Sequence, residues 1–182
     1  FGYSSIVTGL MFFGVLFFIQ DIIGTPFSLY STFIIEEEFG FNKTTLKTYI
    51  LDKIKGYFLL IVFGGGVFSL ILFFFESFGG FAWLYAWMVL SCFIVLIQPL
   101  FTLFIAPMFN KFTPLEDGEL KQRIADYIKK ADFPIARIDV MDGSRRTSKS
   151  NAYFSGLGKN KRIALFDTLI EKHSVDELVS II

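Results

Sequence analysis

Three long stretches of this chain contain no charged residue, and they lie at residues 1–20, 56–75 and 77–110. About 20 predominantly apolar residues are enough for a helix to cross the hydrocarbon core of a bilayer. The third stretch has 34 residues, too few for two crossings and a turn, so we assign it one tilted crossing. The pattern predicts three membrane spans, at about residues 1–20, 56–75 and 81–105. Pro99 and Pro107 are expected to kink or end the third span.

After residue 110 the pattern changes to that of a soluble α+β domain. Thr113, Pro114 and Glu116 have the spacing of a capping box with proline at the first helical position, which predicts that a helix begins here. Apolar residues then recur at helical spacing, and Pro134 is expected to end the helix. The predicted packed face consists of Leu120, Ile124, Tyr127 and Ile128.

Two strands joined by a tight turn are predicted near the end of the chain. A short strand at residues 138–141 precedes the basic loop 143–149, and strands at 151–157 and 162–166 follow it. The turn between the last two strands is Gly158-Lys159-Asn160-Lys161, so these strands should form a hairpin.

A second capping box lies close to the C-terminal end of the sequence. Ser174 and Glu177 have the required spacing, and the apolar stripe that follows is still running at Ile182. We therefore divide the chain into a transmembrane region, residues 1–110, with a loop at 21–55, and the first part of a folded domain, residues 111–182. The sequence begins with Phe rather than Met and lacks a basic leader, so we expect a piece of a longer protein without a signal peptide.

Composition supports an integral membrane protein. Hydrophobic residues make up 53% of the chain, 25 residues are Phe, and the mean hydropathy is +0.57. The 17 basic and 17 acidic residues balance, which is not the charge signature of a nucleic-acid-binding protein. Cys92 is the single cysteine and lies in a predicted span, so no disulfide framework is expected.

The basic residues predict an orientation in the membrane. Residues 21–55 hold four of the 17 Lys and Arg residues, the segment after residue 110 holds the other 13, and the connection at 76–80 holds none. Because basic loops stay on the cytoplasmic side, both hydrophilic segments are expected there and the 76–80 connection outside.

Metal chemistry has little support in this sequence. A zinc protease needs two histidines one helical turn apart and a third ligand, but His173 is the single histidine and directly precedes the capping Ser174. Glu36, Glu37 and Glu38 are adjacent, so their side chains point in different directions around a helix. Gly64-Gly65-Gly66 lies within a span and lacks the Lys-Ser/Thr of a phosphate loop. We expect the chain by itself to bind no stoichiometric zinc and to be inactive.

Asn151, Ala152 and Tyr153 are the candidate substrate-binding residues. An extended peptide can be held by adding a strand to a sheet edge, where an Asn side chain supplies both a donor and an acceptor. A small residue beside it permits close approach of the peptide. An ordinary hairpin strand is the simpler interpretation of these three residues alone.

Three motifs in this order resemble the type I CAAX prenyl proteases, which are intramembrane zinc metallopeptidases. The first motif runs from Pro26 to Asn42, and the second from Ile105 to Leu115. The third comprises Asp142-Gly143-Ser144-Arg145-Arg146 and Ser150-Asn151-Ala152-Tyr153-Phe154. The resemblance extends over nearly the whole chain.

The resemblance implies an α-helical integral membrane fold with three spans of a multi-span chamber, followed by part of an α+β zincin-like protease domain. It implies zinc in the intact protein, with the H-E-x-x-H motif just beyond Ile182, and a substrate-binding edge strand at Asn151, Ala152 and Tyr153. The implied partners are the lipid bilayer and a peptide or prenylated-protein substrate. The implied location is a bacterial inner membrane or the endoplasmic reticulum.

Two other functions stay open at this point. A non-catalytic scaffold or pseudoprotease would keep the edge strand and bind peptides without metal. A transporter or channel is less favoured, because the three uncharged stretches hold none of the ionisable groups that line such pathways.

Overall fold

The computed structural model describes residues 4–156 and 158–182, so the predicted span at 1–20 and strand at 151–157 each include residues outside the described ones. The chain forms two compact units. The helical unit comprises the described residues up to Glu38 together with Leu46–Leu96. The sheet unit comprises Phe39–Thr45 and Ile97–Ile182.

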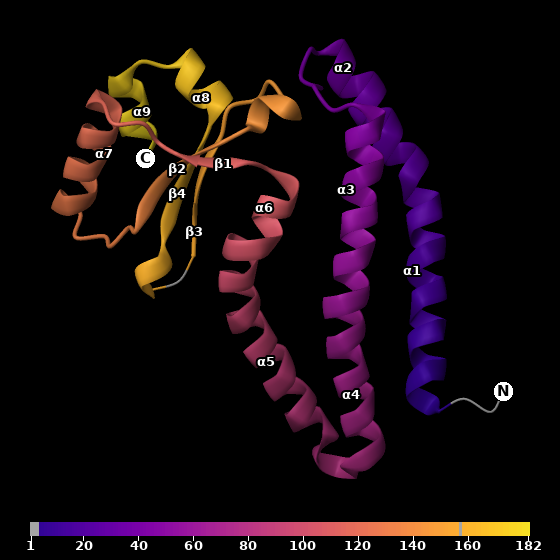
Figure 1. Cartoon of the computed structure of the whole chain (residues 1–182). Coiled ribbons are helices and arrows are strands. Elements are labelled where there is room, and N and C mark those ends of the chain that lie inside the picture. Colours follow the sequence, from indigo (N-terminus) through magenta and orange to yellow (C-terminus); the bar gives the residue numbers. More distant parts are fainter. Residues whose placement is uncertain (1–3, 157) are drawn as a thin grey trace. The chain divides into compact units, whose positions relative to one another are not determined.

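Three long apolar helical stretches are present, which confirms the three-helix prediction (Figure 1). The first consists of α1 (Ser5–Tyr30), the π-helical turn η1 (Ser31–Ile35) and α2 (Glu36–Glu38). The second consists of α3 (Leu46–Leu59), η2 (Leu60–Gly65) and α4 (Gly66–Ser77). The third consists of η3 (Gly79–Phe81), α5 (Ala82–Leu100), η4 (Phe101–Ile105) and α6 (Ala106–Phe109).

The first two helices continue well into the segment 21–55 that we expected to be a loop. The charged residues in this segment do not end the helices, because their side chains pair between α1 and α3. Asp21 on α1 and Lys53 on α3 form an ion pair at 2.8 Å. The Thr25 hydroxyl accepts a hydrogen bond from Lys53, and the Tyr57 hydroxyl donates one to Asp21. A polar cluster of this kind satisfies its members without bulk water, so both helices persist through it.

The prolines inside the long helices do not end them. Pro26 lies inside α1 and Pro99 inside α5, and a π-helical turn begins a few residues after each, at Ser31 and Phe101. Proline removes one backbone donor and displaces the carbonyl four residues earlier. The π-helical turns lie on the C-terminal side of the prolines and not at those carbonyls, and η2 forms without a proline, so the prolines do not account for these turns. The third helical stretch continues past Pro99 to Phe109, so the expected end of the span at Pro99 does not occur.

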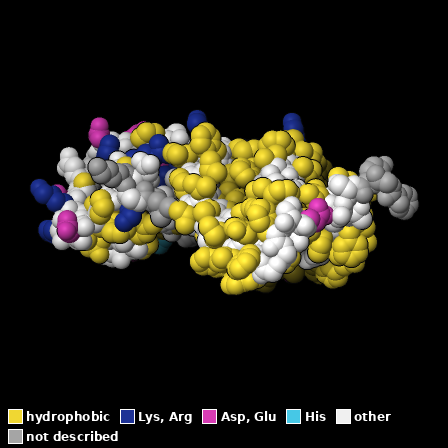
Figure 2. Space-filling model, turned by 90° about the horizontal axis from the view of Figure 1, so that it is seen from below, with side chains coloured by type: hydrophobic (Ala, Val, Ile, Leu, Met, Phe, Trp, Pro, Cys, Tyr) yellow, Lys and Arg dark blue, Asp and Glu magenta, His cyan; other side chains and the backbone are white. Residues whose placement is uncertain are grey.

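The helical surface is hydrophobic all round, as a membrane-facing surface requires. Phe12 is 60% exposed, Ile61 72% and Trp87 62%, one on each long helix. Figure 2 shows hydrophobic side chains covering this part of the molecule almost continuously, while most of the visible charged side chains lie on the sheet unit. Exposed apolar area of this extent in water would cause association, whereas lipid tolerates it. The chain is therefore an integral membrane protein.

The sheet unit contains a four-stranded mixed sheet with strand order β1-β2-β4-β3. The strands are β1 (Phe112–Pro114), β2 (Arg137–Met141), β3 (Ala152–Ser155) and β4 (Arg162–Phe166). β2 and β4 are parallel, and β1 and β3 pair antiparallel with them at the two edges. The predicted hairpin is present as β3 and β4, with the short helix η6 (Gly158–Asn160) between them.

One face of the sheet carries the hydrophobic core. Helices α7 (Glu119–Lys130), α8 (Asp167–Lys172) and α9 (Val175–Ile181) supply the other side, with α7 and α9 next to each other (Figure 1). The buried core residues are Leu115, Ile124, Ile138, Ile163, Leu165, Leu169 and Leu178. The alternation of β2 and β4 puts every second residue into this core, as expected for a sheet covered by helices.

The capping box predicted at Thr113 is wrong. Thr113 and Pro114 belong to strand β1, where Thr113 pairs with Val140 and Pro114 with Asp139. Helix α7 begins six residues later than Thr113, at Glu119, with Gly118 as its N-cap. Proline is compatible with this strand because β1 is an edge strand and needs no second ladder of donors. Pairing with a strand 25 or more residues away overrode the local helix signal.

Candidate functional site

Strand β3 lies at an edge of the sheet, with β4 as its neighbour on one side. The Phe166 N–H donates to the Asn151 carbonyl at 3.0 Å, so the backbone groups of Asn151 face β4. Backbone groups alternate in direction along an antiparallel strand. The N–H and C=O groups of Ala152 and Phe154 therefore point to the free edge, where another extended chain could pair with them.

The Asn151 side chain is placed beside this free edge. Asn151 is exposed, and its Oδ1 accepts a hydrogen bond from the Ala152 N–H at 2.9 Å. The Ala152 N–H is the first outward-facing backbone donor of β3. When no peptide is present, the Asn151 side chain accepts its hydrogen bond. A side chain that already binds at this position is well placed to exchange that bond for one to a peptide backbone.

Ala152 and Tyr153 point to opposite faces of the sheet. Ala152 packs against the hydrophobic core. Tyr153 is half-buried on the other face, and its hydroxyl lies 3.7 Å from Met141 Sδ. Burial raises the pKa of the Tyr153 phenol, while the nearby Arg162 guanidinium lowers it to a lesser degree. The phenol stays neutral at physiological pH and acts as a packing and hydrogen-bonding group.

A cleft of about 300 Å³ runs beside β3 within the sheet unit. Its walls include Asn151 just before β3, Ala152 in β3, Leu169 in α8, His173 between α8 and α9, and Ile181 at the end of α9. The lining combines apolar side chains, such as Leu169 and Ile181, with the residues of β3 and polar Asn151 and His173. This combination suits an extended peptide, whose backbone needs partners and whose side chains need apolar space.

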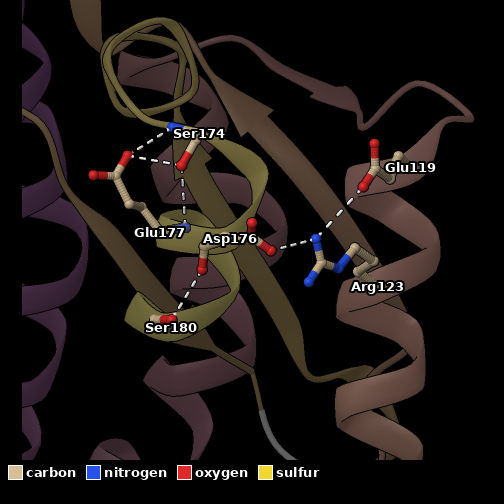
Figure 3. A network of polar contacts seen from close by, with 6 residues as sticks. All are labelled: Glu119, Arg123, Ser174, Asp176, Glu177 and Ser180. Carbon is tan, nitrogen blue, oxygen red and sulfur yellow. Dashed lines mark hydrogen bonds and ion pairs between the residues drawn. The ribbon is translucent and has the colours of Figure 1, made fainter.

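Helix α9 is held in place by the predicted capping box, which is present (Figure 3). The Glu177 carboxylate accepts hydrogen bonds from the Ser174 N–H at 2.8 Å and from the Ser174 hydroxyl at 2.9 Å. Arg123 on α7 reaches Asp176 at 2.5 Å and so ties α9 to α7. The hydrogen bond from the Ser174 N–H is the main cause that lowers the pKa of Glu177, and the pKa of Arg123 is raised by its bond to Asp176.

Replacing Ser174 with Ala should destabilise α9 by about 1 kcal/mol at pH 7, because the helix loses its N-cap. The folded-state pKa of Glu177 is below its ordinary value, so the bond that the Ser174 hydroxyl donates to this carboxylate is present at neutral pH and is lost as pH falls through the lowered pKa. The bond from the Glu177 N–H to the Ser174 hydroxyl does not titrate, so the difference between Ser174→Ala and the parent protein should shrink in part, and not vanish, below about pH 4. Hydrogen exchange of the α9 amides, corrected for intrinsic rates, measures both effects.

Ser180→Ala is the matched control for that experiment. The Ser180 hydroxyl donates to the Asp176 carbonyl at 2.9 Å from the opposite end of the same helix, where it caps nothing (Figure 3). Removal of the Ser180 hydroxyl should change the hydrogen exchange of the α9 amides only slightly, and this small change should not depend on pH. Equal effects of the two substitutions would contradict the capping argument.

The described residues do not fit a zinc site. No group of three His, Cys, Asp or Glu side chains with ligand geometry occurs among them. His173 Nδ1 lies 3.8 Å from the Glu177 carboxylate, as expected for a turn histidine beside a capping residue. Glu36, Glu37 and Glu38 form the last turn of the first long helix, and Gly64 and Gly65 lie in the π-helical turn η2.

The second and third motifs, and the end of the first from Phe39 to Asn42, meet in the sheet unit, which the sequence did not predict. The Asn110 amide oxygen accepts a hydrogen bond from Arg146 at 2.7 Å. The Asp142 carboxylate accepts one from the Lys111 N–H at 2.7 Å. A Cβ on Gly143 would lie 2.3 Å from the Phe166 ring, so this position requires glycine. The charged motif at 142–146 therefore positions the chain leading to β3.

The segment Phe39–Thr45 pairs with the residues just before β3. Asn42 forms a β-bridge with Thr147, the Lys43 N–H donates to the Arg146 carbonyl at 3.0 Å, and the Ser148 N–H donates to Phe41 at 3.0 Å. Gly40 has φ +69°, the left-handed conformation common after a helix end. The link between the first two long helices is thus part of the structure that supports the edge strand.

Comparisons with known proteins agree with this arrangement. Residues 1–111 match the family described as CAAX prenyl protease N-terminal, five membrane helices, and residues 114–182 match peptidase family M48. CAAX prenyl protease 1 of Saccharomyces cerevisiae is 44% identical over 181 residues, which is 98% of this chain and 40% of that protein. The CAAX prenyl protease 1 homolog of Homo sapiens is 41% identical over 171 residues, which is 94% of this chain and 36% of that protein.

A solved structure is similar throughout. The crystal structure of S. mikatae Ste24p superimposes with a TM-score of 0.91 at 43% identity, and covers 97% of this chain and 42% of that one. The chain spans about two fifths of the length of these relatives. With its apolar helices, its partial protease domain and these matches over nearly its whole length, the chain belongs to the CAAX prenyl protease family of membrane peptidases, peptidase family M48.

Proposed function

We propose that this chain provides the substrate-binding edge of a membrane zinc endopeptidase. The free edge of β3 supports the proposal, with the outward backbone groups of Ala152 and Phe154 and the Asn151 amide beside a cleft of about 300 Å³. A substrate peptide would lie antiparallel or parallel to β3 and extend the sheet by one strand. Backbone pairing tolerates many side chains, so the cleft would select mainly for extended shape.

The substrate class follows from the membrane setting and the family. We infer that the substrate is a peptide segment close to the bilayer, and that it is prenylated if this chain follows the relatives whose names state that class. The family implies zinc in the full-length protein, and among the described residues no group of three potential ligands occurs. Within this chain, the residues bind and orient the peptide and position the start of α9.

A photoreactive benzoylphenylalanine at position 154 tests the binding site. Phe154 is 52% exposed on β3, whereas Tyr127 is 47% exposed on α7 and serves as the control position. In a full-length protein that contains this chain, a bound extended peptide should crosslink at 154 and not at 127, and unlabelled peptide should compete. Crosslinking without cleavage by an intact zinc-loaded protein would favour the scaffold function. An active protein that shows no crosslink at 154 would refute the binding site.

The sheet unit is proposed to lie on the cytoplasmic side of the membrane. The 76–80 connection has no Lys or Arg, while 13 of the 17 basic residues follow residue 110. Single cysteines at Ser77 and Lys130 in a Cys92→Ser background should react with impermeant reagents from opposite faces of oriented vesicles. Ser77 should react from outside and Lys130 from the cytoplasmic side; the reverse result would overturn both the topology and the cytoplasmic protease domain.

A further inference from the structure

Arg162 is a buried charge that the proposed function does not use. It is the first residue of the interior strand β4 and is 1% exposed. Strand alternation places it on the face opposite the core residues Ile163 and Leu165. Arginine is almost never buried to this extent unless its donors are engaged.

The Arg162 side chain contacts residues from all three other strands. Its Nε donates to the Ser155 hydroxyl of β3 at 3.1 Å. Its Nη1 lies 3.5 Å from the Asp139 carboxylate of β2, and its guanidinium lies over the Phe112 ring of β1 with Cζ 4.1 Å from the ring centre. The planar guanidinium thus stacks and donates at once, which Lys cannot do.

The charge of Arg162 is only loosely compensated. The Asp139 carboxylate is closer to Arg137, at 2.9 Å, than to Arg162, at 3.5 Å. Arg162 Nη2 is buried and has no hydrogen-bond partner among the residues that the structure describes. Apolar side chains in such a position often give equal or greater stability. Stability alone therefore does not account for an arginine here, whereas a directional bond to β3 does.

The bond to Ser155 acts on the strand that carries the free edge. Ser155 pairs directly with Arg162 across β3 and β4, and Tyr153 pairs with Ala164 on the same face. A slip of one residue in this pairing would turn the backbone groups of Ala152 and Phe154 inward and put Ser155 out of reach of Nε. Packing of Ala152 against the core and the backbone bond from Phe166 to Asn151 also favour this register, and the Arg162–Ser155 bond adds a polar contact that only this register allows.

We propose that Arg162 is a positioning residue that fixes the register of β3 through Ser155 and so keeps its outward backbone groups aligned for the substrate peptide. The proposal rests on the proposed function, because it concerns the same edge. Arg162 itself does not touch the peptide. Its influence should appear only in those substrate contacts that use the β3 backbone.

A cycle of enzyme and substrate variants separates positioning from stability. The full-length protein is assayed with an extended peptide and with a series that carries one N-methyl group at each backbone amide in turn. N-methylation removes a donor that pairs with β3, so at one or two positions it should lower kcat/KM of the parental enzyme roughly 10-fold. Arg162→Met should lower kcat/KM for the unmodified peptide by a similar factor, mainly through KM.

The decisive quantity is the remaining sensitivity to N-methylation. In Arg162→Met, N-methylation should lower kcat/KM by less than about 3-fold, because a misaligned β3 no longer pairs with the amide that is methylated. Arg137→Met is the matched control, since Arg137 binds the same Asp139 but is 52% exposed, and it should keep the full sensitivity. If Arg162→Met fails to accumulate, Ser155→Ala removes the acceptor of Nε, leaves the buried pair intact and should give the same pattern.

The outcomes distinguish the two proposals. Full sensitivity to N-methylation in Arg162→Met and Ser155→Ala would overturn the positioning role while leaving edge binding intact. A parental enzyme that cleaves every N-methylated peptide at the same rate would refute binding along β3, and the positioning role with it.

Discussion

Asn151→Ala in a full-length protein that contains this chain should lower kcat/KM by roughly 10- to 100-fold, the loss expected when one or two hydrogen bonds to a peptide backbone are removed. Zinc content and thermal stability should hardly change. The Asn151 side chain is exposed and bonds within the described residues to the adjacent Ala152 N–H, which water can satisfy after the substitution. Steady-state cleavage of a long peptide, with metal analysis of the same preparation, measures both.

Asn160→Ala is the matched control for this substitution. Asn160 is also exposed and lies on the same hairpin, at the end away from the Asn151 amide. The Asn160→Ala variant should cleave the peptide at nearly the parental rate. Ala152→Ile is a less direct test, because the Ala152 side chain packs against the core and a larger residue would disturb that packing as well as the edge. If Asn151→Ala cleaves like Asn160→Ala, β3 is only a hairpin strand.

Gly156→Ala should destabilise the sheet unit by roughly 2–5 kcal/mol, the sum of a left-handed backbone penalty and a steric clash. Gly156 has φ +96°, and a Cβ there would lie 2.2 Å from the Asn160 carbonyl oxygen. Because the clash is with backbone, a side-chain rotation cannot relieve it. The end of β3 would have to move, so cleavage should fall together with stability.

Gly158→Ala provides the comparison within the same turn. Gly158 has φ +55°, and a Cβ there would meet nothing within 4 Å. Gly158→Ala should therefore lower the stability of the sheet unit by only about 1–2 kcal/mol, the penalty for the left-handed conformation. Thermal unfolding of both variants in the same detergent gives the difference directly. Equal melting temperatures for the two variants would show that the turn relaxes more freely than the structure indicates.

The start of α9 was predictable because its determinants are local. Ser174 and Glu177 are three residues apart, and their mutual hydrogen bonds form within one helical turn. The three long helices were predictable for a similar reason, since the absence of charge over 20 residues excludes most alternatives to a membrane span. Their ends were not, because Asp21 and Lys53 are tolerated through a partner on the neighbouring helix.

The edge strand was foreseen only in part. Residues 151–157 and 162–166 could be recognised as a hairpin from the turn residues between them. That β3 has a free edge depends on β2 pairing with β4 on the other side, and no residue near Asn151 encodes this. The binding role of Asn151, Ala152 and Tyr153 stays a prediction that the variants above test.

The sequence by itself determined the features set by near neighbours: three apolar helices, a hairpin and one capped helix. Tertiary structure decided the features whose partners are distant. Thr113 became part of a strand because β2 supplied backbone partners, and Thr44 reached Arg146 across 102 positions of the chain. The burial of Arg162 likewise needs Phe112, Asp139 and Ser155 together. Long-range pairing can outweigh local propensity, because a backbone group left unpaired in the interior costs more than a weak helix signal contributes.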